Sequence, residues 1–186
     1  MSVIPGFPRD ASIPFPPARR RRGTPVLATN GMGAAQHPLV TGAILSTLAR
    51  GGNAVDAAIA GAWTAAVVMP AACGVGGDLF AIVSKPGDDP VTVLSSGIAP
   101  RNASLEFMRE HGDDGGRLMA RQGPLSPAVP GFPAGVGELH RLYATRAMED
   151  LASLAVGYAA DGFPVTSTLA RQLAASEDLL SRYPAS

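Results

Sequence analysis

Apolar residues recur at helical spacing in the first half of the chain, and proline and glycine mark where the periodic segments begin and end. Pro38 stands where a helix would begin, because its missing N–H costs nothing in a first turn, and Gly51–Gly52 would end that helix. Asn53 is a typical N-cap for a second helix, which is apolar nearly all round and extends to about Val68. We therefore expect two consecutive helices, the second buried on most sides, and for the first an apolar stripe of Leu39, Ile44, Leu45 and Leu48.

Short apolar runs bounded by turn residues predict strands. Residues 79–84 and 91–95 flank the turn sequence Pro-Gly-Asp-Asp-Pro and should form a β-hairpin, and residues 24–36 should form a strand, a turn at Asn30–Gly31 and a second strand. A polar, glycine-rich loop is expected over 112–122, and further helices at about 104–111, 132–143, 148–160 and 166–182. This order of strands and helices predicts a layered fold of the α+β class.

The two ends of the chain differ from the middle. Residues 1–23 contain five prolines and the basic cluster Arg19–Arg22, which is typical of a disordered, solvated arm; a contact with an anionic surface or a nucleic acid is the alternative. Residues 24–186 then form one domain-sized unit, and the chain ends at Ser186 without a closing strand, so we expect this unit to be truncated.

Composition excludes several classes of function. Fifteen basic and fifteen acidic residues give a formal net charge of zero, so the global charge gives no argument for a nucleic-acid partner. A single cysteine excludes a disulfide framework, and three histidines far apart in sequence show no ligand spacing, so we expect no metal and no other cofactor. No segment reaches the ~18 uninterrupted apolar residues of a membrane span, and the N-terminus lacks the charge order of a signal peptide, which favours a cytoplasmic location and leaves secretion open.

Few residues invite a catalytic interpretation. The glycines of 74–77 follow a helix and precede a strand, whereas phosphate-binding loops follow a strand and open a helix, so we expect a tight turn there. Cys73 would need a nearby histidine to act as a nucleophile, and we expect it to be a small buried hydrophobe instead, with His37 bonded to backbone. The acidic pairs Asp113–Asp114 and Glu149–Asp150 are expected to be solvated. The residues alone therefore predict no catalytic group in this chain.

Three sequence elements within residues 31–83 closely resemble the start of γ-glutamyltranspeptidases: AAQHPL at 34–39, RGGNAVDAA at 50–58 and GVGGDLF at 74–80. The resemblance implies an N-terminal-nucleophile hydrolase with an αββα sandwich, of which this chain is the N-terminal portion. In that family a proenzyme cuts itself, and the new N-terminal threonine attacks γ-glutamyl-type amides with its own α-amino group as the base. That threonine would lie beyond residue 186, so the resemblance implies no catalytic residue in this chain, inactivity of the chain alone, and a partner segment from the same precursor.

The sequence departs from the glutathione-using members near the pair Ala99–Pro100. Those members carry an arginine before the pair that grips the substrate α-carboxylate, and here the aligned residue is Ser96. The stretch SSGIAP resembles the acylase-like branch of the family, whose members act on cephalosporins, glutaryl amides or oxamate. An acylase-like amidohydrolase of this kind is the alternative function. We predict that Ser95, Ser96 and Gly97 bind substrate; an ordinary strand end is the competing interpretation. A non-catalytic remnant or interaction module is the alternative from a different class.

Overall fold

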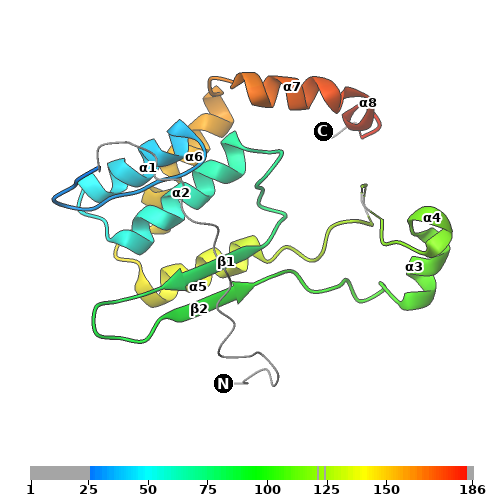
Figure 1. Ribbon diagram of the computed structural model, residues 1–186, viewed down its shortest axis with the longest axis horizontal. Coiled ribbons are helices and arrows are strands. Elements are labelled where there is room, and N and C mark those ends of the chain that lie inside the picture. The colour runs from blue at the N-terminus through cyan, green and yellow to red at the C-terminus, as the bar shows by residue number, and fades with distance from the viewer. Residues whose placement is uncertain (1–25, 121, 124, 184–186) are drawn as a thin grey trace, which may run out of the picture.

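A computed structural model describes residues 26–120, 122–123 and 125–183 of the chain (Figure 1). The expected arm over 1–23 lies outside these residues. Along the sequence the structure contains the following elements: α1 (Pro38–Ala49), α2 (Ala54–Val68), β1 (Leu79–Val83), β2 (Val91–Ser95), α3 (Leu105–His111), α4 (Asp113–Gly116), α5 (Phe132–Tyr143), α6 (Met148–Asp161), α7 (Ser167–Ala175) and α8 (Glu177–Leu180).

Helix α1 begins where the sequence predicts, but it buries a different face. Its N-cap His37 accepts a hydrogen bond from the amide of Leu39, and Pro38 occupies the first turn. The buried positions are the small or β-branched Val40, Ala43 and Thr47. The expected stripe is therefore only partly right: Leu39, Ile44 and Leu48 are half-buried, and Leu45 is exposed. Small residues let two helices approach closely, and Gly61 of α2 leaves space that the side chain of Ile44 occupies.

Helix α2 lies at the centre of the helical layer and contacts α1, α5 and α6 (Figure 1). Asn53 caps it in a capping box: the Asn53 side chain accepts from the amides of Val55 and Asp56, and the Asp56 carboxylate accepts from the amide of Asn53. Seven of its fifteen residues are buried, which confirms the expected helix and its burial. Three other helices therefore pack against α2, as its continuous apolar sequence predicts.

The two strands form the predicted antiparallel hairpin, with Leu79 opposite Ser95 and Val83 opposite Val91. Alternate residues point to opposite faces. One face packs on α5, and Leu79 and Val93 on that face are buried. The other face carries Phe80, Ile82 and Leu94, which are 64%, 74% and 72% exposed.

The expected strands over 24–36 are wrong for the part that the structure describes. Residues 26–36 contain no strand, and Val26 and Leu27 remain 76% and 89% exposed. Within the described residues, the sheet contains β1 and β2 and no neighbour with which this segment pairs. A strand depends on a partner, so an apolar and β-branched sequence alone does not produce one.

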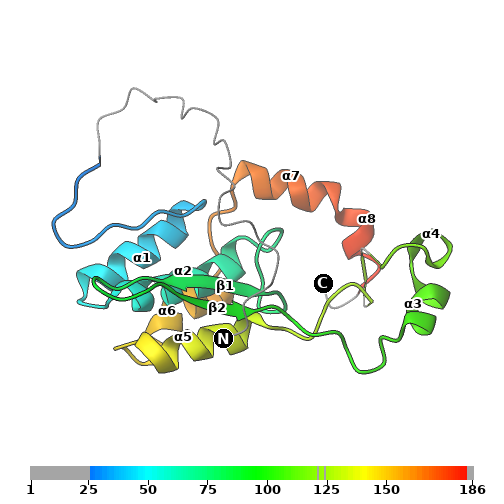
Figure 2. The same ribbon diagram turned by 60° about the horizontal axis from the view of Figure 1, so that its bottom comes forward.

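The core lies between α2, α5, α6 and the hairpin. Trp63 of α2 meets Phe132 of α5 edge to face, with ring centroids 5.2 Å apart. The other predicted helices are present with one correction: the segment 166–182 contains two short helices, α7 and α8, on either side of Ser176. The predicted loop over 112–122 includes the short turn α4, in which Asp114 and Gly115 have left-handed backbone angles. In both views α3 and α4 stand away from the core (Figures 1 and 2).

Candidate functional site

The end of β2 is fixed by contacts with two segments distant in sequence, the turn before β1 and the start of α5. The amides of Gly131 and Phe132 donate to the carbonyl oxygen of Gly77 at 3.0 and 2.8 Å. The hydroxyl of Ser95 donates to the carbonyl oxygen of Gly131 at 2.8 Å. These bonds hold the three segments together as one rigid platform, and by platform we mean residues 77–78, 95–97 and 129–131.

Close backbone approach explains the glycines of the platform. A Cβ on Gly97 would overlap the carbonyl oxygen of Val129 and lie 2.7 Å from the Cβ of Ala128. A Cβ on Gly131 would overlap the carbonyl oxygen of Ser95. Side chains at either position would force the segments apart, so the sequence uses glycine here for space.

The three predicted substrate-binding residues lie in this platform in different environments. Ser95 is half-buried and its hydroxyl is engaged by Gly131, whereas Ser96 is exposed and Gly97 is half-buried. The amide of Gly97 donates to Oδ1 of Asp78 at 2.7 Å. Their role in substrate binding stays a prediction. Sequence reasoning missed Asp78, and the one signal available was an acidic residue between a glycine turn and the strand that follows.

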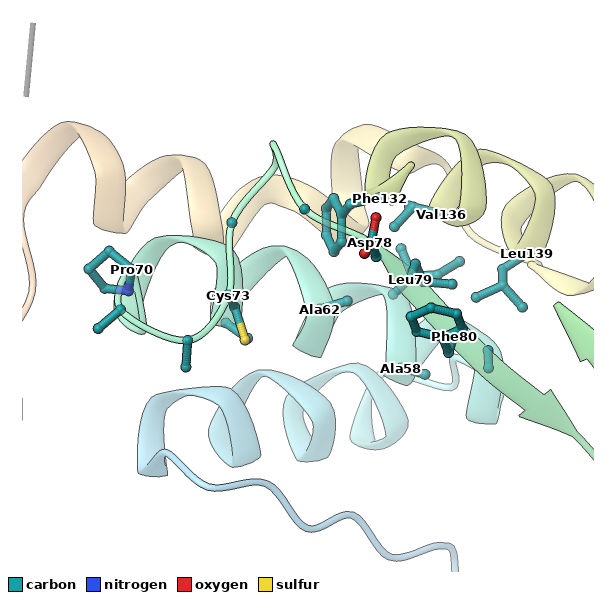
Figure 3. A pocket seen from close by; sticks show the side chains of 17 residues that line it. Ala58, Ala62, Pro70, Cys73, Asp78, Leu79, Phe80, Phe132, Val136 and Leu139 are labelled. Carbon is teal, nitrogen blue, oxygen red and sulfur yellow. The ribbon is translucent and has the colours of Figure 1, made fainter. Parts of the chain in front are cut away.

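A cavity of about 510 Å³ opens between α2, the loop 70–74 and β1 (Figure 3). Its lining is mostly alanine, glycine and the apolar side chains Leu79, Phe80, Phe132, Val136 and Leu139, and Asp78 is its one charged residue among those described. Cys73 also lines it and is exposed, so the expectation of a buried cysteine is wrong. No histidine of the described chain lines this cavity, so it contains no cysteine–histidine pair for nucleophilic catalysis.

A second group of polar contacts ties the start of α2 to the α5–α6 connection. Asp56 is fully buried, and its carboxylate accepts four hydrogen bonds, from the amides of Asn53, Thr145 and Arg146 and from the hydroxyl of Thr145. Burial raises the pKa of Asp56, but the hydrogen bonds from Thr145, Asn53 and Arg146 outweigh it and hold the pKa below its ordinary value. The side-chain amide of Asn53 donates to the carbonyl oxygen of Tyr143 at 2.7 Å.

Residues 41–186 match the family model described as gamma-glutamyltranspeptidase. The chain belongs to the γ-glutamyltranspeptidase family. It is 35% identical over 164 residues to an oxamate amidohydrolase proenzyme of Klebsiella pneumoniae, an alignment that covers 85% of this chain and 30% of that protein. It is also 35% identical over 151 residues to glutathione hydrolase proenzyme 2 of Schizosaccharomyces pombe, covering 81% of this chain and 24% of that protein.

Solved structures of the family share this fold. The γ-glutamyltranspeptidase of Helicobacter pylori superposes with a TM-score of 0.79 and 28% identity, covering 87% of this chain and 46% of that one. A cephalosporin acylase from Bacillus halodurans gives a TM-score of 0.71 and 31% identity, covering 87% of this chain and 31% of that one. The predicted family and the α+β class are therefore confirmed, and the chain corresponds to the N-terminal part of family members and spans less than a third of the two curated relatives described above.

Membership in the γ-glutamyltranspeptidase family gives the RGGNAVDAA element a structural meaning. Gly51 adopts a φ of 83°, which glycine tolerates, and Asn53 and Asp56 form the cap and the buried network just described. The guanidinium of Arg146 donates to the carbonyl oxygen of Arg50 in the same corner. In this chain the element builds the scaffold, and the substrate-facing candidates lie elsewhere, at the platform.

The remaining candidates behave as structural or solvated groups. His37 accepts from the Leu39 amide through Nδ1 at 3.2 Å, which confirms its expected bond to backbone, and its Nε2 is buried with no partner among the described residues. The acidic residues Asp114, Glu149 and Asp150 are exposed, as expected. Within the described ranges, no group of three or more potential metal ligands occurs, and no helix has the length and apolar character to cross a bilayer.

Proposed function

We propose that these residues form the N-terminal scaffold and one wall of the substrate pocket in an amide-cleaving enzyme. The nucleophile then comes from a later segment of the same precursor. The observation that carries this proposal is the platform: a rigid, glycine-packed strand end beside a cavity of about 510 Å³ whose lining offers no nucleophile with a base. Rigid backbone positions a substrate, and the reacting group must be brought to it.

The chemistry we propose is acyl transfer to an N-terminal threonine released by self-cleavage. The threonine hydroxyl attacks the amide carbonyl while its own α-amino group accepts the proton, and the amine leaves. Water or an acceptor amine then attacks the acyl-enzyme and releases the acid or the new amide. Both the Klebsiella pneumoniae and the Schizosaccharomyces pombe relatives are proenzymes, which supports a maturation step of this kind.

The uncovered face of the hairpin supports a partner segment from the same precursor. Phe80, Ile82 and Leu94 stand side by side on it and are each more than 60% exposed. A two-stranded sheet is marginally stable by itself, and an apolar face of this kind is normally covered. We infer that later residues of the precursor pack on this face and bring the nucleophile to the platform.

The acyl group defines two versions of the proposal. The first is a γ-glutamyl-type amide, such as that of glutathione, which the family name and the yeast relative favour. The alternative is an acylase-like activity on another acyl group. Ser96 favours the alternative, because a serine cannot form the two charge-assisted hydrogen bonds that an arginine makes with a carboxylate.

The test uses the precursor that contains these residues, purified and incubated with glutathione, oxamate and glutaryl-p-nitroanilide. We expect two polypeptides on a denaturing gel after maturation, a threonine at the N-terminus of the smaller one, and turnover of at least one amide. Replacement of that threonine by alanine should abolish both maturation and turnover. An uncleaved, inactive precursor would contradict the proposal and favour the interaction module.

A further inference from the structure

A second cavity, of about 330 Å³, lies where the starts of α1 and α7 meet the end of α2. Its apolar lining includes Val68 and Met69 of α2 and Leu169 of α7, and its polar lining includes His37, Thr168 and Gln172. No residue of the hairpin or of the platform lines it, and it shares only residues 71 and 72 with the larger cavity. We call it the α1–α7 cavity.

His37 brings an unpartnered hydrogen-bond donor to this cavity. Its Nδ1 accepts from the amide of Leu39 at 3.2 Å, so the proton of the neutral ring lies on Nε2. The residue is only 8% exposed, and Nε2 is buried with no partner among the described residues. Buried polar groups are nearly always hydrogen-bonded, so an exception in the wall of a cavity indicates a ligand that supplies the acceptor.

The surroundings of His37 favour a negatively charged acceptor. The cavity lies at the N-termini of α1 and α7, where the partial positive charge of a helix attracts anions. The guanidinium of Arg171 donates to the Thr168 hydroxyl at 3.3 Å and forms no ion pair with a described residue. No acidic side chain of the described residues lines the cavity. At the end of α2, the carbonyl oxygen of Met69 already accepts from two amides of the following loop, so both its lone pairs are engaged.

We propose that the α1–α7 cavity binds a small carboxylate with an apolar tail. One carboxylate oxygen accepts from Nε2 of His37, and the other faces the first turn of α7 near Thr168. The tail packs against Val68, Met69 and Leu169, which form the apolar lining. Such a site needs neither the nucleophile nor the proposed amide cleavage, so it is a second binding site beyond the proposed function.

One substitution separates the donor of His37 from its role as a helix cap. His37→Asn keeps a side-chain oxygen that can accept from the Leu39 amide, because asparagine is a favoured N-cap, but it lacks the imidazole N–H. His111→Asn is the matched control, because α3 stands away from the core and from this cavity (Figures 1 and 2).

Calorimetric titration of the precursor with butyrate, and with its neutral isostere butyramide, tests the site. We expect butyrate to bind roughly fivefold more tightly than butyramide, because only butyrate carries the charge that the helix N-termini favour. His37→Asn should weaken butyrate binding roughly tenfold, which is the range of one hydrogen bond to a charged group, and His111→Asn should not change it. Absence of butyrate binding, or equal butyrate affinity in the wild type and His37→Asn, would overturn the proposal.

A second pair of variants keeps the site testable if His37→Asn does not fold. Gln172 lines the cavity from the exposed surface of α7, so Gln172→Glu adds a negative charge there without disturbing a buried side chain. We expect it to weaken butyrate binding roughly tenfold and to leave butyramide binding unchanged. Ala174→Glu adds the same charge to α7 at an exposed position outside the lining and should change neither affinity. Equal effects of the two glutamates on butyrate would contradict a carboxylate site in this cavity.

Discussion

Two regions of the molecule differ in whether their side chains are buried and hydrogen-bonded within this chain. One is the corner where the start of α2 meets the α5–α6 connection, and the other is the outer face of the hairpin. In the corner, Asp56 is fully buried and all four of its hydrogen-bond donors come from neighbouring segments of this chain. On the outer face, Phe80 and Ile82 are exposed, and Asp78 accepts a single amide in the described chain. The corner is complete within these residues, whereas the face and the platform beside it have groups that further chain or a ligand would satisfy.

This difference separates scaffold from pocket. A buried carboxylate with every donor satisfied fixes the relative positions of α2, α5 and α6, and it has no capacity left to bind substrate. A charge without a partner is stable while water solvates it. An exposed apolar patch, in turn, marks a surface on which another segment or a ligand packs. We therefore expect substitutions in the corner to reduce stability, and substitutions on the face and platform to reduce assembly or activity.

The largest effect should come from Asp56→Ala. The variant leaves the amides of Asn53, Thr145 and Arg146 and the Thr145 hydroxyl without their acceptor in a buried site. We expect the free energy of unfolding in urea to fall by about 3–5 kcal/mol. Asp161→Ala, at the exposed end of α6, should change it by less than about 0.5 kcal/mol. Similar losses in the two variants would contradict the role of the network.

The hairpin face should respond differently in the chain alone and in the precursor. Phe80→Ser removes an exposed aromatic ring, so the stability of the 186-residue chain should change by less than about 0.5 kcal/mol. In the precursor the same ring would be covered, and its loss should cost about 2–3 kcal/mol and slow maturation. Thermal unfolding and a time course of self-cleavage measure the two effects. Equal changes in both proteins would mean that the face stays exposed.

The same glycine-to-alanine change should lower the free energy of unfolding at the platform and raise it in α5. Gly97→Ala forces a methyl group against the Val129 carbonyl and should cost about 1–3 kcal/mol of unfolding free energy. Gly137→Ala, in α5, meets no atom within 4 Å and should stabilise the helix by about 0.5–1 kcal/mol. Urea titration of both variants decides the matter. Stabilisation by Gly97→Ala would show that the close approach at the platform is not required.

The smallest expected effect is a pH dependence of the corner. The pKa of Asp56 in the folded protein lies below its ordinary value of 3.8. A carboxyl group with a lowered pKa stabilises the folded state above its unfolded pKa, and this stabilisation is lost as the pH falls toward the folded pKa. The stability difference between the wild type and Asp56→Asn should therefore be constant from about pH 5 to 7 and shrink below about pH 4. A difference that grows in acid would contradict the assignment.

Local sequence signals predicted where the helices begin. The predictions that were wrong depended on contacts with segments distant in sequence. Asn53 and Thr166 cap their helices by accepting hydrogen bonds from amides two or three residues ahead, and Pro38 suits the first turn of α1 because it has no N–H to leave unpaired. The sequence alone identifies these starts. The face that α1 buries depends on the shape of α2, and the absence of a strand over 26–36 depends on which neighbours exist. Neither can be derived from the spacing of apolar residues within one segment.

The candidate site was predictable only in part for the same reason. The resemblance identified Ser95, Ser96 and Gly97 from one segment, but the platform is formed by three segments that meet in space. Asp78 joins it through its carboxylate and Gly131 through its backbone, and neither contact has a sequence pattern. Cys73 looked like a buried hydrophobe by composition, whereas the loop that carries it borders the cavity and is exposed.

We propose that these residues supply scaffold and pocket wall and that the nucleophile comes from elsewhere in the precursor. The most direct test assays the purified 186-residue chain and the mature enzyme side by side with the same amide substrates. We expect turnover by the mature enzyme and none by the chain alone, although the chain should retain the helical circular dichroism of α2, α5 and α6. Cleavage of an amide by the 186-residue chain itself would contradict it.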